Sequence, residues 1–328
     1  MSLSLSFDMR VPDFGPPGKV LYKAALDQCE WADRVGFRSV VLSEHHASPD
    51  GYMPSPLVMA SAIGARTRRL RIMISLILLP FYHPQRLAED AAVCDLVCGG
   101  RLDLMFGAGY REDEFDMYGI DIHQRGRMMS NGIEFLKEAW TGEPFEFQGR
   151  TVQILPRPAQ QPRPRIVLGG ASPASARRAA RIADAYAPIA PRLYEIYLEE
   201  LAKLGKPPPA GGDPRVAQST AVVAVSDDPE RTWNAIERNL MHDAAVYGAW
   251  TAGRRGSMFA QVGSPEELRA SGQYLVLTPE ECLSRTAKSS SLQFRPLVGG
   301  VDPDIAWESL HLFESRVLPH LEVNQPPS

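Results

Sequence analysis

A carboxylate and two adjacent histidines, Glu44-His45-His46, follow the short run 39–42 after one serine, Ser43. Imidazole titrates near neutral pH and a carboxylate can orient it, so Glu44 and His45 are candidates for a catalytic acid–base pair. Because adjacent side chains of an extended chain point in opposite directions, we expect one histidine to face a pocket. The other is expected to pack or to bond to the backbone. A purely structural pair of histidines at the end of a strand is the alternative interpretation.

Metal binding is a second use of histidine and glutamate side chains. Neither an HExxH spacing, nor a second histidine cluster, nor a carboxylate triplet accompanies this segment, so we predict no metal ion. The four cysteines are too few and too scattered for a disulfide scaffold.

Two glycine-containing segments could bring the backbone close to a ligand. Gly107-Ala108-Gly109, followed by Tyr110, lacks the third glycine of a dinucleotide fingerprint. Gly169-Gly170-Ala171-Ser172 precedes a predicted helix, whose N-terminus, backbone amides and serine hydroxyl could hold an anion such as phosphate. Ser172 could equally be an ordinary helix N-cap with no ligand, and the residues alone leave these two interpretations even.

The elements that must position these groups alternate between short apolar runs and amphipathic helical stretches. Such alternation predicts an α/β protein with a parallel sheet, and eight repeats of it predict a (β/α)₈ TIM barrel. An open doubly wound sheet would need a glycine-rich first turn, which is missing after the first run. In a barrel the carboxyl ends of the strands meet, so the segments above would lie together. The predicted strands are 3–7, 39–42, 71–79, 101–106, 165–168, 185–189, 216–225 and 292–298.

Two segments interrupt the alternation. Residues 141–164 contain an alternating stretch with a glycine turn, which predicts a small insertion such as a hairpin. Residues 249–279 are rich in glycine and serine and predict a lid-like loop before the last strand. We otherwise assign all 328 residues, 1–328, to a single barrel domain.

Charge and hydropathy exclude several classes of partner. With 35 basic and 39 acidic residues the formal net charge is −4, which offers no global field for nucleic acid or an anionic membrane. No apolar run approaches the roughly 20 residues of a membrane span, and the N-terminal residues do not resemble a secretory signal. We expect a cytoplasmic enzyme.

Several motifs in order give a more specific indication. They are Gly36-Phe37, Glu44-His45-His46, the run from Leu79 to Pro84, Gly100-Arg101-Leu102, Thr141-Gly142 and the Gly-Gly-Ala-Ser loop. Together they resemble the bacterial luciferase-like, flavin-dependent monooxygenase superfamily, whose members are (β/α)₈ barrels.

The resemblance implies roles for particular residues. His45 would lie near the reactive face of the flavin, and Ser75-Leu76 would form a non-prolyl cis peptide that braces the isoalloxazine ring. Ala171, Ser172 and Ser175 would lie at the flavin phosphate, where Ala108 replaces an arginine of luciferase. The predicted cofactor-binding residues are Ser75, Leu76, Gly107, Ala108, Gly109, Gly169, Gly170, Ala171, Ser172 and Ser175.

The activity implied is a monooxygenase that uses reduced FMN from a separate reductase, together with O₂, to oxygenate a small organic substrate. The alternative is a dehydrogenase or reductase that uses the deazaflavin coenzyme F-420, because Gly-Ala-Gly-Tyr is closer to relatives of that kind. A non-catalytic flavin-binding protein is a second alternative. His46 and Tyr110 are assigned to the substrate pocket, and Tyr52, Met53 and Phe259 suggest an apolar ligand. By analogy we expect a homodimer.

Overall fold

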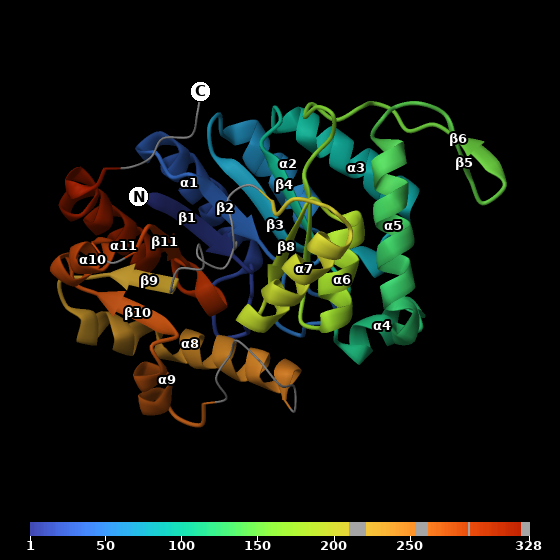
Figure 1. The fold of residues 1–328 in the computed structure, drawn as a ribbon. Coiled ribbons are helices and arrows are strands. Elements are labelled where there is room, and N and C mark those ends of the chain that lie inside the picture. The colour runs from blue at the N-terminus through green and yellow to red at the C-terminus, as the bar shows by residue number, and fades with distance from the viewer. Residues whose placement is uncertain (210–220, 253–261, 288, 323–328) are drawn as a thin grey trace.

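A parallel sheet lies at the centre of the protein (Figure 1). The computed structural model describes residues 1–209, 221–252, 262–287 and 289–322. Nine strands in this part of the chain pair in the order β10-β9-β11-β1-β2-β3-β4-β7-β8. They are β1 (Ser2–Phe7), β2 (Ser39–Leu42), β3 (Arg71–Leu78), β4 (Leu102–Gly107), β7 (Ile166–Gly170), β8 (Ala185–Pro188), β9 (Ala221–Val225), β10 (Tyr274–Leu277) and β11 (Ser291–Phe294).

Helices surround the sheet in an order that follows the strands. Neighbours contact one another in the series α11, α1, α2, α3, α5, α6, α7. This outer layer of helices over a parallel sheet confirms the predicted α/β architecture of the TIM-barrel type. The helices are α1 (Gly18–Val35), α2 (Pro56–Arg66), α3 (Pro84–Val97), α4 (Glu112–Tyr118), α5 (Arg125–Ala139), α6 (Pro173–Ile182), α7 (Pro191–Lys203), α8 (Pro229–Thr251), α9 (Pro265–Ser271), α10 (Pro279–Thr286) and α11 (Pro303–Arg316).

Alternation of side chains sets the register of the strands. In β1 the apolar residues Leu3, Leu5 and Phe7 are buried, and the serines between them are only partly buried. Leu5 pairs with Val40 and Phe7 with Leu42, so apolar side chains of neighbouring strands lie on the same side. A slip of one residue would turn every one of these side chains to the other face.

The predicted loop over 249–279 is wrong for residues 265–277. This stretch forms α9 and then β10, which pairs with β9, and the side chain of Tyr274 in β10 is buried. The sheet therefore has one strand more than the eight predicted. Residues 253–261, and with them Phe259, lie outside the described residues.

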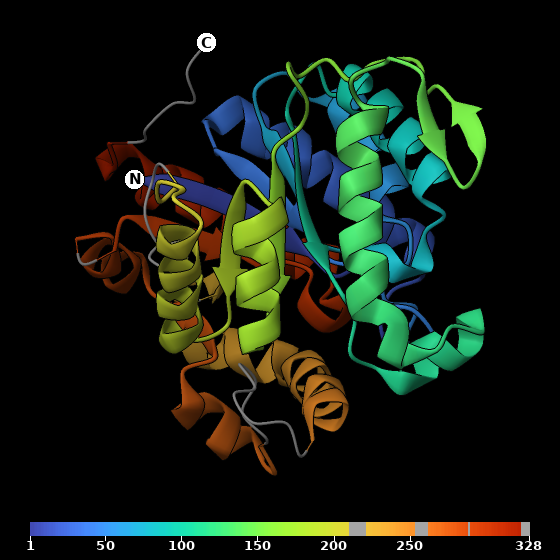
Figure 2. The ribbon, with the colours of Figure 1, turned by 45° about the vertical axis from the view of Figure 1, so that its right-hand side comes forward.

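Two further details refine the predicted barrel. Within the described residues no hydrogen-bonded ladder joins β8 to β9 or β10, so the ring of strands is not closed by backbone pairing. The predicted hairpin is confirmed: β5 (Phe145–Phe147) and β6 (Arg150–Val152) pair antiparallel and project from the body beyond α5 (Figure 2).

Helix α8 lies across the carboxyl ends of the strands. It runs along the lower side of the molecule in both views (Figures 1 and 2). Asn239 donates a hydrogen bond of 2.9 Å from Nδ2 to the carbonyl of Gly299, shortly after β11. Gly299 has a φ of 59° and would collide with the backbone of Asn239 if it carried a Cβ, so glycine permits this close approach. The helix therefore forms a roof over the strand ends.

No helix in the described ranges combines the length and the apolar character needed to cross a bilayer.

Candidate active site

His45 is held by a carboxylate of α4. Its Nδ1 lies 2.8 Å from Oε1 of Glu114, which also accepts a hydrogen bond of 2.8 Å from the backbone N–H of His46. Glu114 is fully buried, and all of these contacts reach one oxygen, Oε1, while Oε2 has no hydrogen-bond partner among the described residues. Arg111 adds a contact of 3.5 Å to the same oxygen. Glu114 was not among the predicted site residues.

Glu44 is the partner of His46, and the prediction that it orients His45 is wrong. Oε1 of Glu44 lies 2.7 Å from Nε2 of His46, and Oε2 accepts a hydrogen bond from the backbone N–H of Leu78. The hydroxyl of Tyr118 lies 3.0 Å from Nδ1 of His46, so both nitrogens of that ring are engaged. The physical reason is alternation, because residues two apart on an extended chain point the same way. Burial raises the pKa of Glu44.

Aromatic rings enclose the other side of His45. Ring centroids lie 4.6 Å away for Trp250, 5.1 Å for Tyr52 and 6.4 Å for Tyr247. We call these three residues the aromatic box; two of them come from the last turns of α8. The structure also brings the predicted Tyr110 to 5.6 Å. His46 contacts other rings, those of Phe81 and Tyr118, so the two histidines have different surroundings.

The environment of His45 favours its neutral form. Burial lowers the pKa of His45, and the nearby cations Arg111 and Arg10 lower it further, against the opposing effect of Glu114. Because a carboxylate only accepts, Nδ1 of the neutral ring must donate to Glu114. Among the described residues Nε2 forms no hydrogen bond, so it is left as an acceptor. His45 is thus arranged as a base.

The predicted flavin residues of β3, β4 and β7 lie together. The Ser75–Leu76 peptide bond is cis, as expected. The Leu76 side chain lies against two glycines: a Cβ on Gly107 would come within 2.6 Å of it, and one on Gly169 within 2.5 Å. We call Leu76, Gly107 and Gly169 the glycine floor. Glycine at both positions therefore makes room for the Leu76 side chain, which follows the cis peptide bond.

Ser172 and Ser175 cap the N-terminus of α6. Ser175 N–H donates to Oγ of Ser172 at 3.2 Å, and Ser172 N–H donates to Oγ of Ser175 at 3.1 Å. Oγ of Ser175 is also 3.0 Å from the hydroxyl of Tyr186, and it occupies the space in which Gly170 lacks a side chain. Ala171 and Ser172 are exposed, so the predicted anion site is open to solvent. The N-cap and the anion site are compatible, because the helix dipole and outward N–H groups remain.

A cation that sequence reasoning missed extends from the same helix. Arg178 follows Ser175 by three residues, which places both on one face of α6. Its Nε donates to Oγ of Ser130 at 3.2 Å, and within the described part of the chain it forms no ion pair. Burial and the neighbouring Arg181 lower the pKa of Arg178. A half-buried cation without a counter-ion suits an anionic ligand, and Ala108 supplies no such charge.

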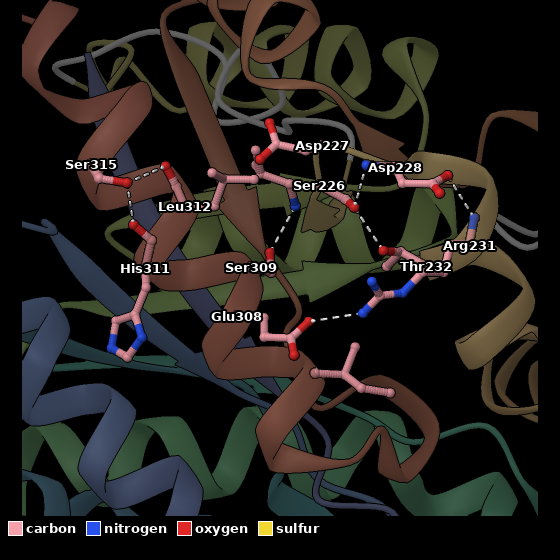
Figure 3. A pocket seen from close by; sticks show the side chains of 12 residues that line it. Ser226, Asp227, Asp228, Arg231, Thr232, Glu308, Ser309, His311, Leu312 and Ser315 are labelled. Carbon is pink, nitrogen blue, oxygen red and sulfur yellow. Dashed lines mark hydrogen bonds and ion pairs between the residues drawn. The ribbon is translucent and has the colours of Figure 1, made fainter.

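A separate cavity lies away from these residues. It has a volume of about 500 Å³ and is formed where α8 begins and α11 passes (Figure 3). Its polar groups largely bond to one another: Oγ of Ser309 accepts from Val225 N–H at 2.7 Å, and Arg231 reaches Glu308 at 3.7 Å. None of the predicted site residues lines it. In the described ranges no three or more His, Cys, Asp or Glu side chains are grouped to hold a metal ion.

A family model for luciferase-like monooxygenases matches residues 5–293. The chain belongs to the luciferase-like monooxygenase family. The resemblance read from the motifs is thereby confirmed. Relatives named as monooxygenases support an oxidoreductase.

Curated relatives of this family member fall into two groups. The oxygenase component of a flavin-dependent trigonelline monooxygenase from Acinetobacter baylyi is 30% identical over 164 residues, covering 48% of this chain and 45% of that protein. An F420-dependent glucose-6-phosphate dehydrogenase from Microbacterium testaceum is 28% identical over 350 residues, covering 98% of each. The chain spans about half the length of the first curated relatives that it matches. The match covers 46% and 48% of two uncharacterized proteins of Sinorhizobium fredii.

Solved structures share the fold over the whole chain. Monooxygenase RslO1 from Streptomyces bottropensis superposes with a TM-score of 0.76 at 23% identity, covering 98% of this chain and 99% of that one. The oxygenating constituent of 3,6-diketocamphane monooxygenase from Pseudomonas putida, solved with FMN, gives 0.72 at 21%, covering 99% of each. At these identities the likeness concerns the fold.

Proposed function

We propose that this luciferase-like protein is the oxygenase of a two-component monooxygenase. It would take reduced FMN from a separate reductase and use O₂ to oxygenate a small organic substrate. The observation that carries the proposal is the position of His45. It follows strand β2, which lies next to β3, the strand that carries Leu76 of the glycine floor, and its ring contacts the aromatic box. A buried neutral base on the strand next to β3 supports proton transfer beside a ring cofactor held at that strand.

The residues present fit a flavin. The glycine floor would lie against the ring system, and the N-terminus of α6 with Ser172, Ser175 and Arg178 would hold the phosphate. Reduced flavin, when bound, supplies the electrons with which O₂ is activated. Nε2 of His45 would accept a proton from a substrate hydroxyl, and Glu114 would stabilise the imidazolium that results. The box would exclude water from that proton transfer.

The second candidate is an F-420-dependent dehydrogenase or reductase. Ala108, in place of a phosphate-binding arginine, and the full-length similarity to an F420-dependent dehydrogenase favour it. Oxidised deazaflavin, when bound, would supply the hydride acceptor, and His45 would accept the proton of a substrate alcohol. The same site geometry serves both reactions, so the choice between them rests on the cofactor.

Anaerobic titration distinguishes the candidates. Reduced FMN and reduced F-420 are each titrated into the protein, and the complexes are then mixed with O₂ in a stopped-flow spectrometer. Binding of reduced FMN, with a course of reoxidation different from that of free reduced FMN, is expected. Binding of F-420 alone without O₂ uptake would establish the dehydrogenase. His45→Asn and the wild type are then compared with a substrate that the wild type converts. Equal amounts of product from both would show that His45 has no catalytic role.

The proposal includes two protein contacts. A separate reductase supplies the reduced flavin, since the chain carries no nicotinamide fingerprint. A homodimer is proposed as the assembly, and sedimentation velocity of the purified protein tests it.

A further inference from the structure

Arg10 contacts the same three rings as His45. Its guanidinium carbon lies 4.7 Å from the ring centroid of Tyr52, 4.9 Å from that of Tyr247 and 4.8 Å from that of Trp250. Arg10 follows β1 and is fully buried. Arg111 also lies over the Trp250 ring, at 4.1 Å from its centroid. The aromatic box therefore has one histidine and two arginines against it, and Arg10 and His45 follow two neighbouring strands.

Arg10 and His45 are held in the same manner. Nε of Arg10 donates to Asp243 at 3.0 Å and Nη1 donates to Asp50, while Nη2 is buried without a hydrogen-bond partner. His45 is likewise fixed through one nitrogen by Glu114, and its Nε2 is unpaired within the described residues. A buried N–H without a partner is costly unless a ligand completes it. The box thus offers one unpaired donor and one unpaired acceptor.

The charge of Arg10 is already compensated. Three buried carboxylates, Asp8, Asp50 and Asp243, face two arginines, Arg10 and Arg295. His242 adds a contact of 2.8 Å to Asp50. Arg111 is paired as well, with Asp113 and Glu114. Because each of these arginines already has carboxylate partners, a further anion at Nη2 would be buried without a cation of its own. The unpaired N–H therefore suits a neutral acceptor oxygen.

The strand order separates this place from the glycine floor. His45 follows β2, Arg10 follows β1, and the floor residues belong to β3, β4 and β7 on the other side of β2. A flavin on the floor would therefore be held by other strands than those that carry His45 and Arg10. Trp250 is partly exposed, whereas Tyr52 and Tyr247 are buried, so access to the box is from the Trp250 side.

We propose that the aromatic box is the substrate site and that it takes a neutral, planar hydroxyarene with a second, acceptor oxygen. That oxygen accepts a hydrogen bond from Nη2 of Arg10, the hydroxyl donates to Nε2 of His45, and the ring packs against the box. Arg10 is then the residue that orients the substrate. This inference rests on the proposed function only for the chemistry that follows binding.

Four small probes test the two hydrogen bonds separately. 4-Hydroxyacetophenone carries both groups, acetophenone lacks the hydroxyl, 4-ethylphenol lacks the acceptor, and 4-hydroxybenzoate is an anion. Each is titrated by calorimetry into the protein with and without FMN. We expect 4-hydroxyacetophenone to bind about tenfold or more tightly than each of the others. Equal affinity for 4-ethylphenol, tightest binding of 4-hydroxybenzoate, or no binding of 4-hydroxyacetophenone overturns the inference.

Two arginine variants locate the acceptor contact. Arg10→Lys keeps the charge but loses Nη2, so the preference over 4-ethylphenol should disappear while that over acetophenone persists. Arg295→Lys is the matched control, because Arg295 binds the carboxylates Asp8 and Asp243 but lies over the ring of Tyr274 and not over a ring of the box. Arg295→Lys should keep the preference for 4-hydroxyacetophenone over both 4-ethylphenol and acetophenone. If only Arg295→Lys lost these preferences, Arg10 would not be the residue that contacts the acceptor oxygen. If Arg10→Lys does not fold, the probe series on the wild type still decides.

The outcome is separable from that of the proposed function. Failure of reduced FMN to bind, with the probe preferences intact, refutes the flavin proposal and leaves the hydroxyarene site. Binding of flavin without any probe preference refutes the hydroxyarene site alone.

Discussion

Glu114 lies 2.8 Å from Nδ1 of His45, although the two residues are 69 positions apart in the chain. They come from the segments that follow β4 and β2, so the fold of the sheet brings them together. The contact fixes the imidazole tautomer and directs Nε2 away from the carboxylate. The proposed acid–base role of His45 would therefore depend on a helix that contains none of the predicted site residues.

The pKa of His45 provides a first prediction. Because burial, Arg111 and Arg10 lower it below the ordinary 6.5, the neutral base should persist into mildly acidic solution. The acidic limb of a His45-dependent rate is expected below pH 6.5. Stability is affected in the same range: the unfolded chain binds this proton first, so stability should fall as the pH drops below 6.5. NMR of the ¹³C-labelled His45 ring measures the titration directly, and a midpoint above 6.5 would contradict the prediction.

The two glutamates should differ when each is changed to glutamine. Glu114→Gln removes the carboxylate that raises the pKa of His45 and fixes its tautomer, so proton transfer should slow by up to about a hundredfold. Glu44→Gln is the matched control and should leave the ¹⁵N shifts of His45 unchanged. It should cost about 1–3 kcal/mol of unfolding free energy through its bonds to His46 and Leu78. If Glu44→Gln slowed proton transfer and Glu114→Gln did not, Glu44 would be the carboxylate that orients His45.

A methyl group on the glycine floor should disturb flavin binding. In Gly169→Ala the new Cβ would lie 2.5 Å from Leu76, so that side chain must move, at a cost of about 1–3 kcal/mol. The affinity for FMN should fall, and Leu76→Ala in the same chain should restore part of it, because all the close atoms belong to the Leu76 side chain beyond its Cβ. Gly18→Ala, with its nearest neighbour at 3.5 Å, should bind FMN as the wild type does. If the Gly169→Ala, Leu76→Ala double variant lost the sum of the two single losses in FMN affinity, a clash between these side chains would not be the cause.

Arg178 should distinguish FMN from riboflavin. If it pairs with the phosphate, Arg178→Gln should weaken FMN binding by about tenfold or more through loss of a charge-assisted hydrogen bond. Riboflavin, which has no phosphate, should bind both proteins equally. The adjacent Arg177→Gln, at an exposed position, is the control and should change neither affinity. Equal weakening of both ligands by Arg178→Gln would point to a structural role.

The ionic contacts beneath α8 should be essential for stability. Asp243 is fully buried, and although burial opposes ionisation, Arg295 and Arg10 lower its pKa. Asp243→Asn would remove the buried carboxylate that contacts both Arg10 and Arg295 and should cost about 3 kcal/mol or more. Urea denaturation measures this loss, and the exposed pair that Arg192 forms with Glu195 provides the comparison. Arg192→Gln should have no measurable effect.

The fold and the site segments that follow strands could be predicted from the sequence because both depend on a local pattern. Strand alternation is a local pattern, so the sheet, the hairpin and the segments after β2, β3, β4 and β7 could be placed. β10 was missed because Tyr274 to Leu277 is a short apolar run among polar residues. Glu44 was paired with the wrong histidine although the alternation rule itself pairs it with His46.

The remaining site residues depend on tertiary placement. Arg10 follows β1, and the rule that groups gather at strand ends would have drawn attention to it. Tyr247 and Trp250 had no such signal, because their helix follows β9 and reaches His45 only by crossing the strand ends. Periodicity shows that α8 is a helix but does not give its direction over the sheet. Glu114 likewise acquires its partner only when the two loops fold together.

The crossing of α8 over the strand ends has a consequence for divergence within the family. Ring-facing side chains at positions 247 and 250 can change without altering the strands that carry the glycine floor. If the box binds the substrate and the floor binds the flavin, as we propose, exchange of this one helix would change the substrate preference and leave flavin binding unchanged. Such an exchange would have to keep a carboxylate at position 243, because Asp243 binds both Arg10 and Arg295.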